Sequence, residues 1–235
     1  MGSSLMAVIP LRPVQTSSDT LTELVFEAIK DGIVRKSLPP GGRVSEAALA
    51  AQLQVSKTPV REALLRLRHI GLVRLVETGL HIVVPSHQAV REAYELRAGL
   101  ERMSAELAAS RARPTAKEEV VLAARSSLDC ASASDREGFG RWDGTFHRLV
   151  AGACGNAQLT TAIEDSLVLT SALRVRDVPV SGDSIACGRD HVTVAEAIVE
   201  GDRRAAADVM QRHVEHVMSI VLEALSEKRG TAARL

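Results

Sequence analysis

The residues Val55–Leu72 constrain the fold of this chain more than any other stretch of its sequence. Their apolar side chains recur at helical spacing and would share one face of a helix. That face consists of Val60, Ala63, Leu64, Leu67 and Ile70. Ser56 and Thr58 are each suited to cap the start of this helix, and Pro59 fits its first turn, where the missing N–H breaks no hydrogen bond.

Charge gives this predicted helix a second property. Between Lys57 and Arg74 the sequence contains five basic residues and a single acid, Glu62. Cations and free N–H groups at a helix N-terminus bind backbone phosphates, and the side chains of the first turn reach base edges. We therefore predict that this is the recognition helix of a DNA-binding unit.

The residues before this helix support that interpretation. A helical pattern that begins near Leu21 ends near Lys36, because the following prolines and glycines of Leu38–Gly42 cannot continue a helix. Ser45 is placed to cap a short second helix that ends near Leu53. Two short helices joined by a brief turn, the second of them cationic, form a helix-turn-helix.

A β-hairpin is predicted after the recognition helix. The stretches Leu72–Val76 and Leu80–Val84 are short, rich in β-branched residues, and separated by Glu77-Thr78-Gly79. A hairpin in this place predicts a winged helix-turn-helix over residues 18–85. The alternative is a helical subdomain that binds protein.

The remainder of the chain is predicted to be helical. Residues 86–228 show successive helical patterns separated by turn signals, which predicts an all-α bundle of about six helices. Within it, Thr115–Glu118 has the pattern of a capping box that would open a helix. Residues 1–17 and 229–235 are expected to be tails. The fold class is therefore mainly α, a winged helix-turn-helix followed by an all-α bundle.

Charge and composition exclude several classes of protein. The net charge is zero, but residues 1–85 have ten basic and seven acidic residues, and the rest has nineteen and twenty-two. A basic front and an acidic back suggest two different tasks. The three cysteines are far apart and form no C-x-x-C, so neither a disulfide framework nor a zinc ribbon is expected. No apolar run approaches the length of a membrane span, and a cytoplasmic protein without a membrane partner is predicted.

One group of residues has the spacing of a metal site. Asp143 and His147 are four residues apart and would share a helix face. His191 and His213 lie at similar distances on either side of a predicted turn at Gly201-Asp202, so they would be side by side in a helical hairpin. The alternative is that these are ordinary surface or core histidines.

The first domain resembles the DNA-binding domain of the GntR family of bacterial regulators. The resemblance rests on Ser56-Lys-Thr-Pro-Val-Arg-Glu-Ala-Leu64, on Gly71-Leu-Val73, and on the Pro40-Gly41 loop. It implies DNA contacts at Arg43, Ser56, Lys57, Thr58, Arg61 and Gly79. Lys57 stands where the family usually has an arginine that contacts a base, and the family's usual Arg-Gly is replaced at the tip of the wing by Glu77-Thr78-Gly79.

The second domain resembles the FCD effector-binding domain of the FadR-like GntR branch. The matching pattern is Asp143-x-x-Phe146-His147, Gly155-Asn156, His191, Gly201-Asp202 and His213. The resemblance implies a divalent metal ion held by Asp143, His147, His191 and His213. From nitrogen and oxygen ligands zinc is favoured, with nickel or manganese as alternatives.

The same resemblance implies a small organic acid as effector. Arg97, four residues before Glu101, matches a family arginine that would pair with an effector carboxylate. A structural pair with Glu101 is the alternative. Asn156 is a second candidate for effector binding, with helix capping as its alternative role.

These features together predict a metabolite-responsive transcriptional regulator that is not an enzyme. The regulator is expected to be a homodimeric repressor that binds double-stranded DNA at a short inverted repeat, because a two-fold symmetric protein requires a palindromic site. Two alternatives place a metalloenzyme-like or a purely dimerising helical domain behind the helix-turn-helix.

Overall fold

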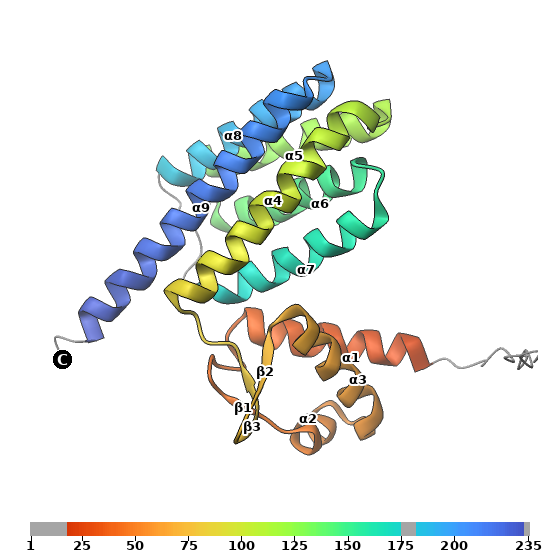
Figure 1. The fold of residues 1–235 in the computed structure, drawn as a ribbon, viewed down its shortest axis with the longest axis vertical. Helices are drawn as coiled ribbons and strands as arrows, with labels where there is room; N and C mark the ends of the chain where they lie inside the picture. Colours follow the sequence, from red (N-terminus) through yellow and green to blue (C-terminus); the bar gives the residue numbers. More distant parts are fainter. Residues whose placement is uncertain (1–17, 175–181, 233–235) are drawn as a thin grey trace, which may run out of the picture.

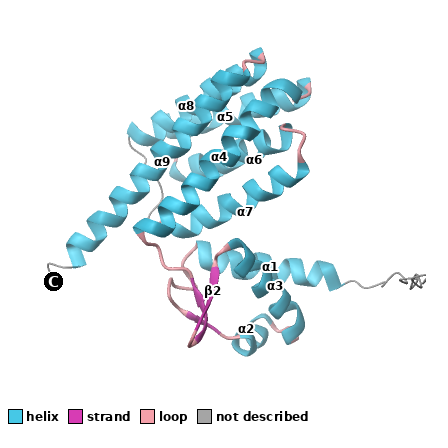
Figure 2. Ribbon diagram, viewed as in Figure 1, coloured by secondary structure: helices cyan, strands magenta, loops and turns pink. Residues whose placement is uncertain are grey.

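The chain folds into a small unit of helices and strands and a larger unit of helices alone (Figures 1 and 2). The computed structural model describes residues 18–174 and 182–232. The elements of the small unit are α1 (Ser18–Val34), β1 (Arg43–Val44), α2 (Glu46–Leu53), α3 (Lys57–Ile70), β2 (Val73–Val76) and β3 (Gly79–Ile82). Those of the helical unit are α4 (His87–Arg111), α5 (Pro114–Ser132), α6 (Arg136–Ala153), α7 (Ala157–Leu173), α8 (Gly182–Glu200) and α9 (Arg203–Ala232). The predicted fold class is confirmed.

Helix α3 provides the central apolar face of the small unit. Its buried side chains are Pro59, Val60, Ala63, Leu64, Leu67 and Ile70. They pack mainly against α1, and the core between the two helices includes the buried Phe26, Ile29 and Ile33. Burial of one continuous face explains why the helical periodicity is so clear in the sequence.

The two ends of α3 differ in how they are closed. At the C-terminal end Gly71 adopts a positive φ of 90°, and the N–H of Leu72 donates to the carbonyl of Leu67 at 2.9 Å. This left-handed residue favours glycine and turns the chain directly into the hairpin. At the N-terminal end Ser56 stands in the capping position, but its side chain makes no capping hydrogen bond, and Thr58 lies inside the helix. The predicted side-chain cap was wrong.

The hairpin gains a third strand that the sequence analysis did not predict. The sheet has the order β1-β3-β2, and both pairings are antiparallel. Its added strand is only Arg43–Val44, which is too short to show an alternating pattern. The strand β1 therefore anchors the loop before α2 to the predicted wing.

The helical unit is built around α4. This helix packs along α9 on one side and α7 on another, while α5 packs against α6 and α8 (Figure 1). Asp135 caps α6 by accepting from the N–H of Gly138 at 2.8 Å. The predicted capping box at Thr115 was wrong, because α5 already begins at Pro114 and no side chain caps it. A proline in the first turn starts this helix instead.

The two units are packed together through α7. Leu169 packs against the core of each unit, and the buried Ala172 belongs to the core of the small unit. The ammonium group of Lys36, just after α1, donates to the carbonyl of Ala172 near the C-terminal end of α7. A cation there also interacts favourably with the helix dipole.

Part of the sequence-based prediction falls on residues that are not described. The predicted tail 1–17, residues 175–181 and residues 233–235 lie outside the described residues. Over the ranges that are described, no helix is long and apolar enough to cross a membrane.

Candidate metal centre and DNA-binding surface

Four side chains from three helices meet in the interior of the helical unit. Asp143 and His147 come from α6, His191 from α8 and His213 from α9. One ligand atom from each of these residues lies within 4.8 Å of every other. All three histidines are buried. The structure thus brings together the four residues that sequence spacing and family resemblance had singled out as metal ligands.

The Nε2 atoms of the three imidazoles point at one another. His213 Nε2 lies 3.2 Å from His191 Nε2 and 3.4 Å from His147 Nε2. Asp143 Oδ1 lies 3.7 Å from His191 Nε2 and 3.9 Å from His147 Nε2. Four potential ligand atoms therefore surround one point.

The groups behind the imidazoles determine which nitrogen carries the proton. Ser127 Oγ donates to the carbonyl of Ala124 at 2.7 Å, so it must accept from His191 Nδ1, which is 2.9 Å away. His147 Nδ1 donates to a carboxylate oxygen of Glu101. With the proton held at Nδ1, the Nε2 atom of a neutral imidazole presents a lone pair.

His213 is oriented less tightly. Its Nδ1 atom lies 3.5 Å from Asp190 Oδ2, a distance too long for a good hydrogen bond. This buried nitrogen has no hydrogen-bond partner in the described part of the chain. The nearby carboxylate nevertheless favours the same tautomer, because it attracts an N–H on this side of the ring.

Burial keeps the imidazoles of His191 and His213 neutral. Burial, followed by repulsion from His213 and His147, lowers the pKa of His191 well below its usual value. Burial likewise lowers the pKa of His213. For Asp143, burial would raise the pKa, but electrostatic interactions with His147 and Arg174 outweigh burial and hold the pKa below its ordinary range. Neutral imidazoles and an ionised carboxylate are the forms that bind metal ions.

The donor set fits a divalent metal ion. The Nε2 atoms lie 3.2 and 3.4 Å apart, and a cation between them would relieve the repulsion between their lone pairs. Two nitrogens bound to one tetrahedral zinc ion at about 2.0–2.1 Å are roughly 3.3 Å apart. Three imidazoles and one carboxylate suit zinc, and they also suit nickel and manganese.

Arg97 lies behind the ligands and is already paired. Its side chain is buried on α4, and its Nε atom donates to Glu101, the same carboxylate that accepts from His147. Its Nη1 atom lies 3.5 Å from the hydroxyl of Thr170 on α7. Burial would raise the pKa of Glu101, but its interactions with Arg97 and His147 lower the pKa to about 2. Glu101 thus remains ionised between Arg97 and His147, which both donate hydrogen bonds to it.

A cavity connects this centre with the small unit. It has a volume of about 1320 Å³, and its walls include Asp143, Arg97 and Arg174 from the helical unit. On the other side it is lined by α1, including Phe26 and Lys30. A molecule bound in it would therefore contact elements of both units.

Asn156 occupies a different place from the other predicted effector residue. Its Oδ1 atom accepts from the N–H of Leu159 at 3.2 Å and caps α7. It is not among the residues that line the cavity, whereas Arg97 is. The geometry agrees with the alternative role that the sequence left open for Asn156, helix capping.

The predicted DNA-contacting residues of the recognition helix are exposed. Lys57, Thr58 and Arg61 are exposed on the first turns of α3, beyond the capping position of Ser56. Arg61 Nη2 forms an ion pair at 3.1 Å with Glu46 at the start of α2. This contact orients the guanidinium, which stays 64% exposed.

The two predicted DNA-contacting residues of the wing, Arg43 and Gly79, lie next to each other. Gly79 has a φ of +117°, and a Cβ atom at this position would lie 3.5 Å from Arg43 Nε. The glycine permits this turn conformation, and the guanidinium of Arg43 lies beside it. This contact arises only because β1 joins the hairpin.

The sequence analysis missed the groups that orient two of the imidazoles. Asp190 directly precedes His191 in sequence, but it faces His213 on another helix. Ser127 lies on α5 and no sequence pattern marks it. Glu101 was noticed only as a partner for Arg97, whereas it also fixes His147. Of these three groups, the sequence marks only Glu101, because it lies one helical turn after Arg97.

Comparisons with known proteins agree with this architecture. A family model described as "FCD domain" matches residues 92–216, and one described as "Bacterial regulatory proteins, gntR family" matches residues 21–79. The solved structure of Escherichia coli McbR/YncC superposes with a TM-score of 0.72 at 20% identity, covering 87% of this chain and 98% of that one. At this identity the likeness supports the fold alone.

Relatives by sequence are regulators of transcription. The chain is 31% identical over 201 residues to the probable D-xylose utilization operon transcriptional repressor of Paenarthrobacter nicotinovorans, covering 83% of this chain and 86% of that protein. It is 25% identical to the HTH-type transcriptional repressor GlaR of Escherichia coli K12, covering 88% and 99%. These relatives are transcriptional regulators rather than enzymes. The chain belongs to the GntR family of bacterial regulatory proteins, with a DNA-binding helix-turn-helix followed by an FCD domain.

Proposed function

We propose that this regulator is a repressor that binds a divalent metal ion and a small organic acid in its helical unit and responds by changing its affinity for DNA. The observation that carries the proposal is that three imidazole Nε2 atoms and one carboxylate face a single point. The Nε2 atom of His213 lies 3.2 Å from that of His191 and 3.4 Å from that of His147. Repression is the direction suggested by relatives that are themselves named repressors.

The residues around the centre suggest how an acid would be held. A divalent ion at Asp143, His147, His191 and His213 would supply a Lewis-acidic partner for a carboxylate. Arg97 and Arg174 place positive charge on the wall of the adjoining cavity, where a second anionic or polar group would lie. Because α1 forms the opposite wall of the cavity, a bound acid would contact the small unit directly.

Metal content is the first test. Elemental analysis should find one divalent ion per chain in the purified wild type, and His191→Ala should lose most of it, because a ligand and its lone pair are removed. His87→Ala is a suitable control, since that side chain is half-buried and hydrogen-bonds to Ser226 away from the centre. Equal metal content in the wild type and His191→Ala would refute the site.

Effector binding can be tested with a panel of small mono- and dicarboxylates. In the presence of zinc they should raise the thermal midpoint of the wild type, and the gain should be absent in His191→Ala. The FCD domain would be a purely dimerising module if no acid shifts the midpoint with or without metal. An acid that stabilises both proteins equally would argue against a role for the metal in effector binding.

DNA binding has its own test. Arg61→Ala should weaken binding to a duplex selected by the wild type from a random library by about 1–3 kcal/mol, because it removes a major-groove contact. Metal content and the effector-induced thermal shift should remain. Unchanged affinity in a gel shift would remove α3 from the DNA interface.

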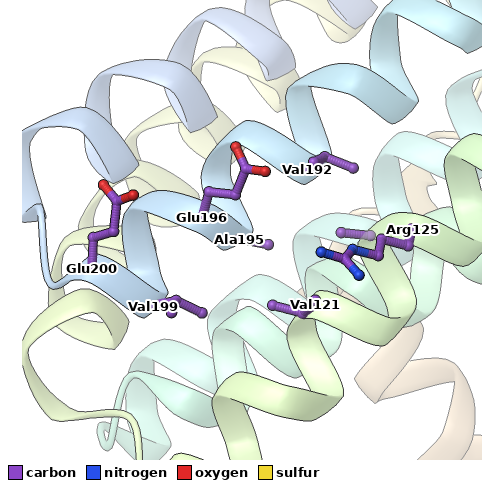
Figure 3. A pocket seen from close by; sticks show the side chains of 8 residues that line it. Val121, Arg125, Val192, Ala195, Glu196, Val199 and Glu200 are labelled. Carbon is purple, nitrogen blue, oxygen red and sulfur yellow. The ribbon is translucent and has the colours of Figure 1, made fainter.

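We also propose that the protein is a homodimer that binds an inverted repeat, and that its partner surface is the groove between α5 and α8 (Figure 3). Two adjoining hollows of about 250 and 550 Å³ lie along this groove. The apolar Leu122 and Val199 at its edge are 60% and 47% exposed. Apolar side chains gathered in one exposed groove are typical of a protein interface.

Charge supports a second copy of the chain as the partner. Arg125 lies on the α5 side of the groove, and Glu196 and Glu200 lie on the α8 side (Figure 3). None of these three has an ion pair within the described part of the chain. A two-fold axis would bring Arg125 of each copy against the acidic side of the other, so the surface is complementary to itself.

Sedimentation analysis tests this surface. Leu122→Asp with Val199→Asp should convert a wild-type dimer to monomer, while Leu96→Asp, at a leucine 58% exposed on α4, should not. Arg125→Glu should weaken the dimer, and adding Glu196→Arg should restore it. A dimer that survives the aspartates would place the interface elsewhere, and a wild type that is monomeric at all concentrations would refute the homodimer itself.

A further inference from the structure

The last turn of α7 lies between the candidate metal centre and the small unit. Thr170 is buried on the side that faces the helical unit, where its hydroxyl lies 3.5 Å from Nη1 of Arg97 on α4. Leu169 and Ala172 project from other sides of the same helix and pack against the core of the small unit. The carbonyl of Ala172 also accepts from the ammonium group of Lys36. A shift of this turn would therefore change contacts in both units.

A chain of buried polar contacts leads from the metal centre to this turn. His147 of the candidate centre donates from Nδ1 to Glu101, and the same carboxylate accepts from Nε of Arg97. The hydroxyl of Thr170 donates to the carbonyl of Ser166 at 2.9 Å, so it offers a lone pair to the guanidinium of Arg97. We call Glu101, Arg97 and Thr170 the relay.

The relay is shielded from water over its whole length. Each of its three residues is no more than 2% exposed. A buried polar group that loses one partner is not solvated in its place, so the loss favours rearrangement of its neighbours. A movement of His147 would therefore be passed on to Arg97 and Thr170 instead of being absorbed by solvent.

Occupancy of the metal centre bears directly on His147. An ion bound at Nε2 would fix one edge of this ring while Glu101 fixes the other. In the absence of an ion, the facing Nε2 atoms of His147 and His213, 3.4 Å apart, relieve the repulsion between their lone pairs by a turn of a ring or a change of tautomer. Either change at His147 disturbs its hydrogen bond to Glu101.

We propose that a divalent cation is itself a signal for this regulator, and that the relay transmits it from the metal centre to the small unit. The inference rests on the proposed function, because it requires both the metal centre and DNA binding. It goes further in that the ion alone, without an organic acid, changes the affinity for DNA. Thr170 is a positioning residue in this scheme, since it contacts Arg97 and is not a metal ligand.

Zinc-dependent DNA binding tests the inference. The chelated protein is titrated with a duplex of about 30 base pairs that the wild type selects from a random library, with and without saturating zinc and with no organic acid present. Zinc should change the DNA affinity of the wild type by at least about fivefold, the lower end of coupling between two sites. Because such coupling is reciprocal, the duplex should change the zinc affinity by the same factor.

Thr170→Val keeps the shape of the side chain but removes the hydroxyl that faces Arg97. Its zinc affinity, measured in competition with a chelator, should stay within about twofold of the wild type, and zinc should change its DNA affinity by less than about twofold. Thr170→Ser returns the hydroxyl and should restore the coupling. Thr161→Val is the matched control, since Thr161 is exposed on the same helix and donates to the carbonyl of Ala157. This variant should show the coupling of the wild type.

Full coupling in Thr170→Val overturns the inference. A loss of zinc affinity in that variant also overturns it, because Thr170 would then support the metal centre without transmitting its state. A wild type that binds zinc and the duplex with no coupling refutes the inference and leaves the proposed function standing. A wild type that binds no zinc refutes the proposed metal centre itself. The reciprocal measurement on the wild type needs no variant, so it decides the matter even if Thr170→Val does not fold.

Discussion

At the scale of single residues, the candidate metal centre depends on the groups behind its ligands. Glu101 accepts from His147 and from Arg97, and Ser127 accepts from His191. These contacts place each proton on Nδ1 and leave Nε2 free to bind a metal ion. Partners of this kind typically change metal affinity when they are removed.

Glu101→Gln should therefore affect both metal binding and stability. The neutral amide leaves Arg97 buried without a countercharge, which should lower the free energy of unfolding by about 3–5 kcal/mol. Zinc affinity should fall about 10–100-fold because His147 loses its orienting carboxylate. Urea unfolding and competition with a chelator measure the two effects.

Glu106→Gln on the same helix is the control. Glu106 forms a surface ion pair with Arg203 at 2.7 Å, and such pairs contribute about 0–1 kcal/mol. Similar losses in Glu101→Gln and Glu106→Gln would show that the buried position of Glu101 has no special role.

The cysteines provide a second prediction at this scale. Burial, together with the nearby charges of Asp143 and Asp190, raises the pKa of Cys187 to about 12. The thiol form therefore persists at every pH below that value, and the reactive thiolate is scarce at pH 8. In the native protein iodoacetamide should leave Cys187 unmodified, as peptide mass spectrometry can show. Labelling in urea, where Cys187 becomes accessible, is the positive control, and rapid native labelling would contradict the prediction.

At the scale of elements, α5 and α8 approach closely because of one glycine. A Cβ atom at Gly188 would lie 2.8 Å from the Cα of Leu128, closer than real contacts allow. The helices must separate if any side chain is added there. This close packing also positions Ser127 on α5 near His191 on α8.

Gly188→Ala should destabilise the protein by roughly 1–3 kcal/mol, since it overpacks a helix contact that involves backbone. Gly99→Ala is the matched control, because a Cβ at Gly99 would meet nothing within 4 Å. That exposed helical substitution should instead stabilise by roughly 0.5–1 kcal/mol. Urea unfolding curves give both values, and equal signs for the two substitutions would disprove the packing argument.

At the scale of the whole molecule, the DNA-binding unit and the helical unit share apolar contacts. Leu169 on α7 packs against both cores, and it would touch a Cβ atom added at Gly71, just after the recognition helix. Helix α7 also borders the cavity beside the candidate metal centre. This single helix is thus the most direct physical connection between the two sites.

Leu169→Ala should weaken that connection. We expect a loss of roughly 1–3 kcal/mol and separate unfolding of the two units, because the shared side chain is truncated. Fluorescence of Trp142, the single tryptophan of the chain, reports on the helical unit, while circular dichroism reports on all helices. The two signals should coincide in the wild type and diverge in the variant. Leu96→Ala, at an exposed leucine, should retain coincident transitions, and coincidence in Leu169→Ala would contradict the prediction.

Much of this architecture was predictable because it depends on local patterns. The recognition helix is predicted by an apolar face that repeats within four turns. Gly71, in the left-handed conformation that favours glycine, ends the helix. Asp143 and His147 share a face through their spacing alone. Local hydroxyl patterns were less reliable. Ser45 caps α2 as predicted and accepts from the N–H of Ala48 at 3.4 Å, but neither Ser56 nor the Thr115 capping box caps a helix. The reason is that several residues compete to begin a helix, and packing selects among them.

The sequence by itself determined the helical periodicity, the helix-turn-helix with its hairpin, and the four candidate ligands. Only the tertiary structure decided what surrounds them. It placed β1 beside the hairpin, and it set Glu101 of α4 against His147 of α6. It also set Ser127 behind His191 from a different helix. The physical reason is range: periodicity acts over a few residues, whereas these contacts join segments that packing alone brings together.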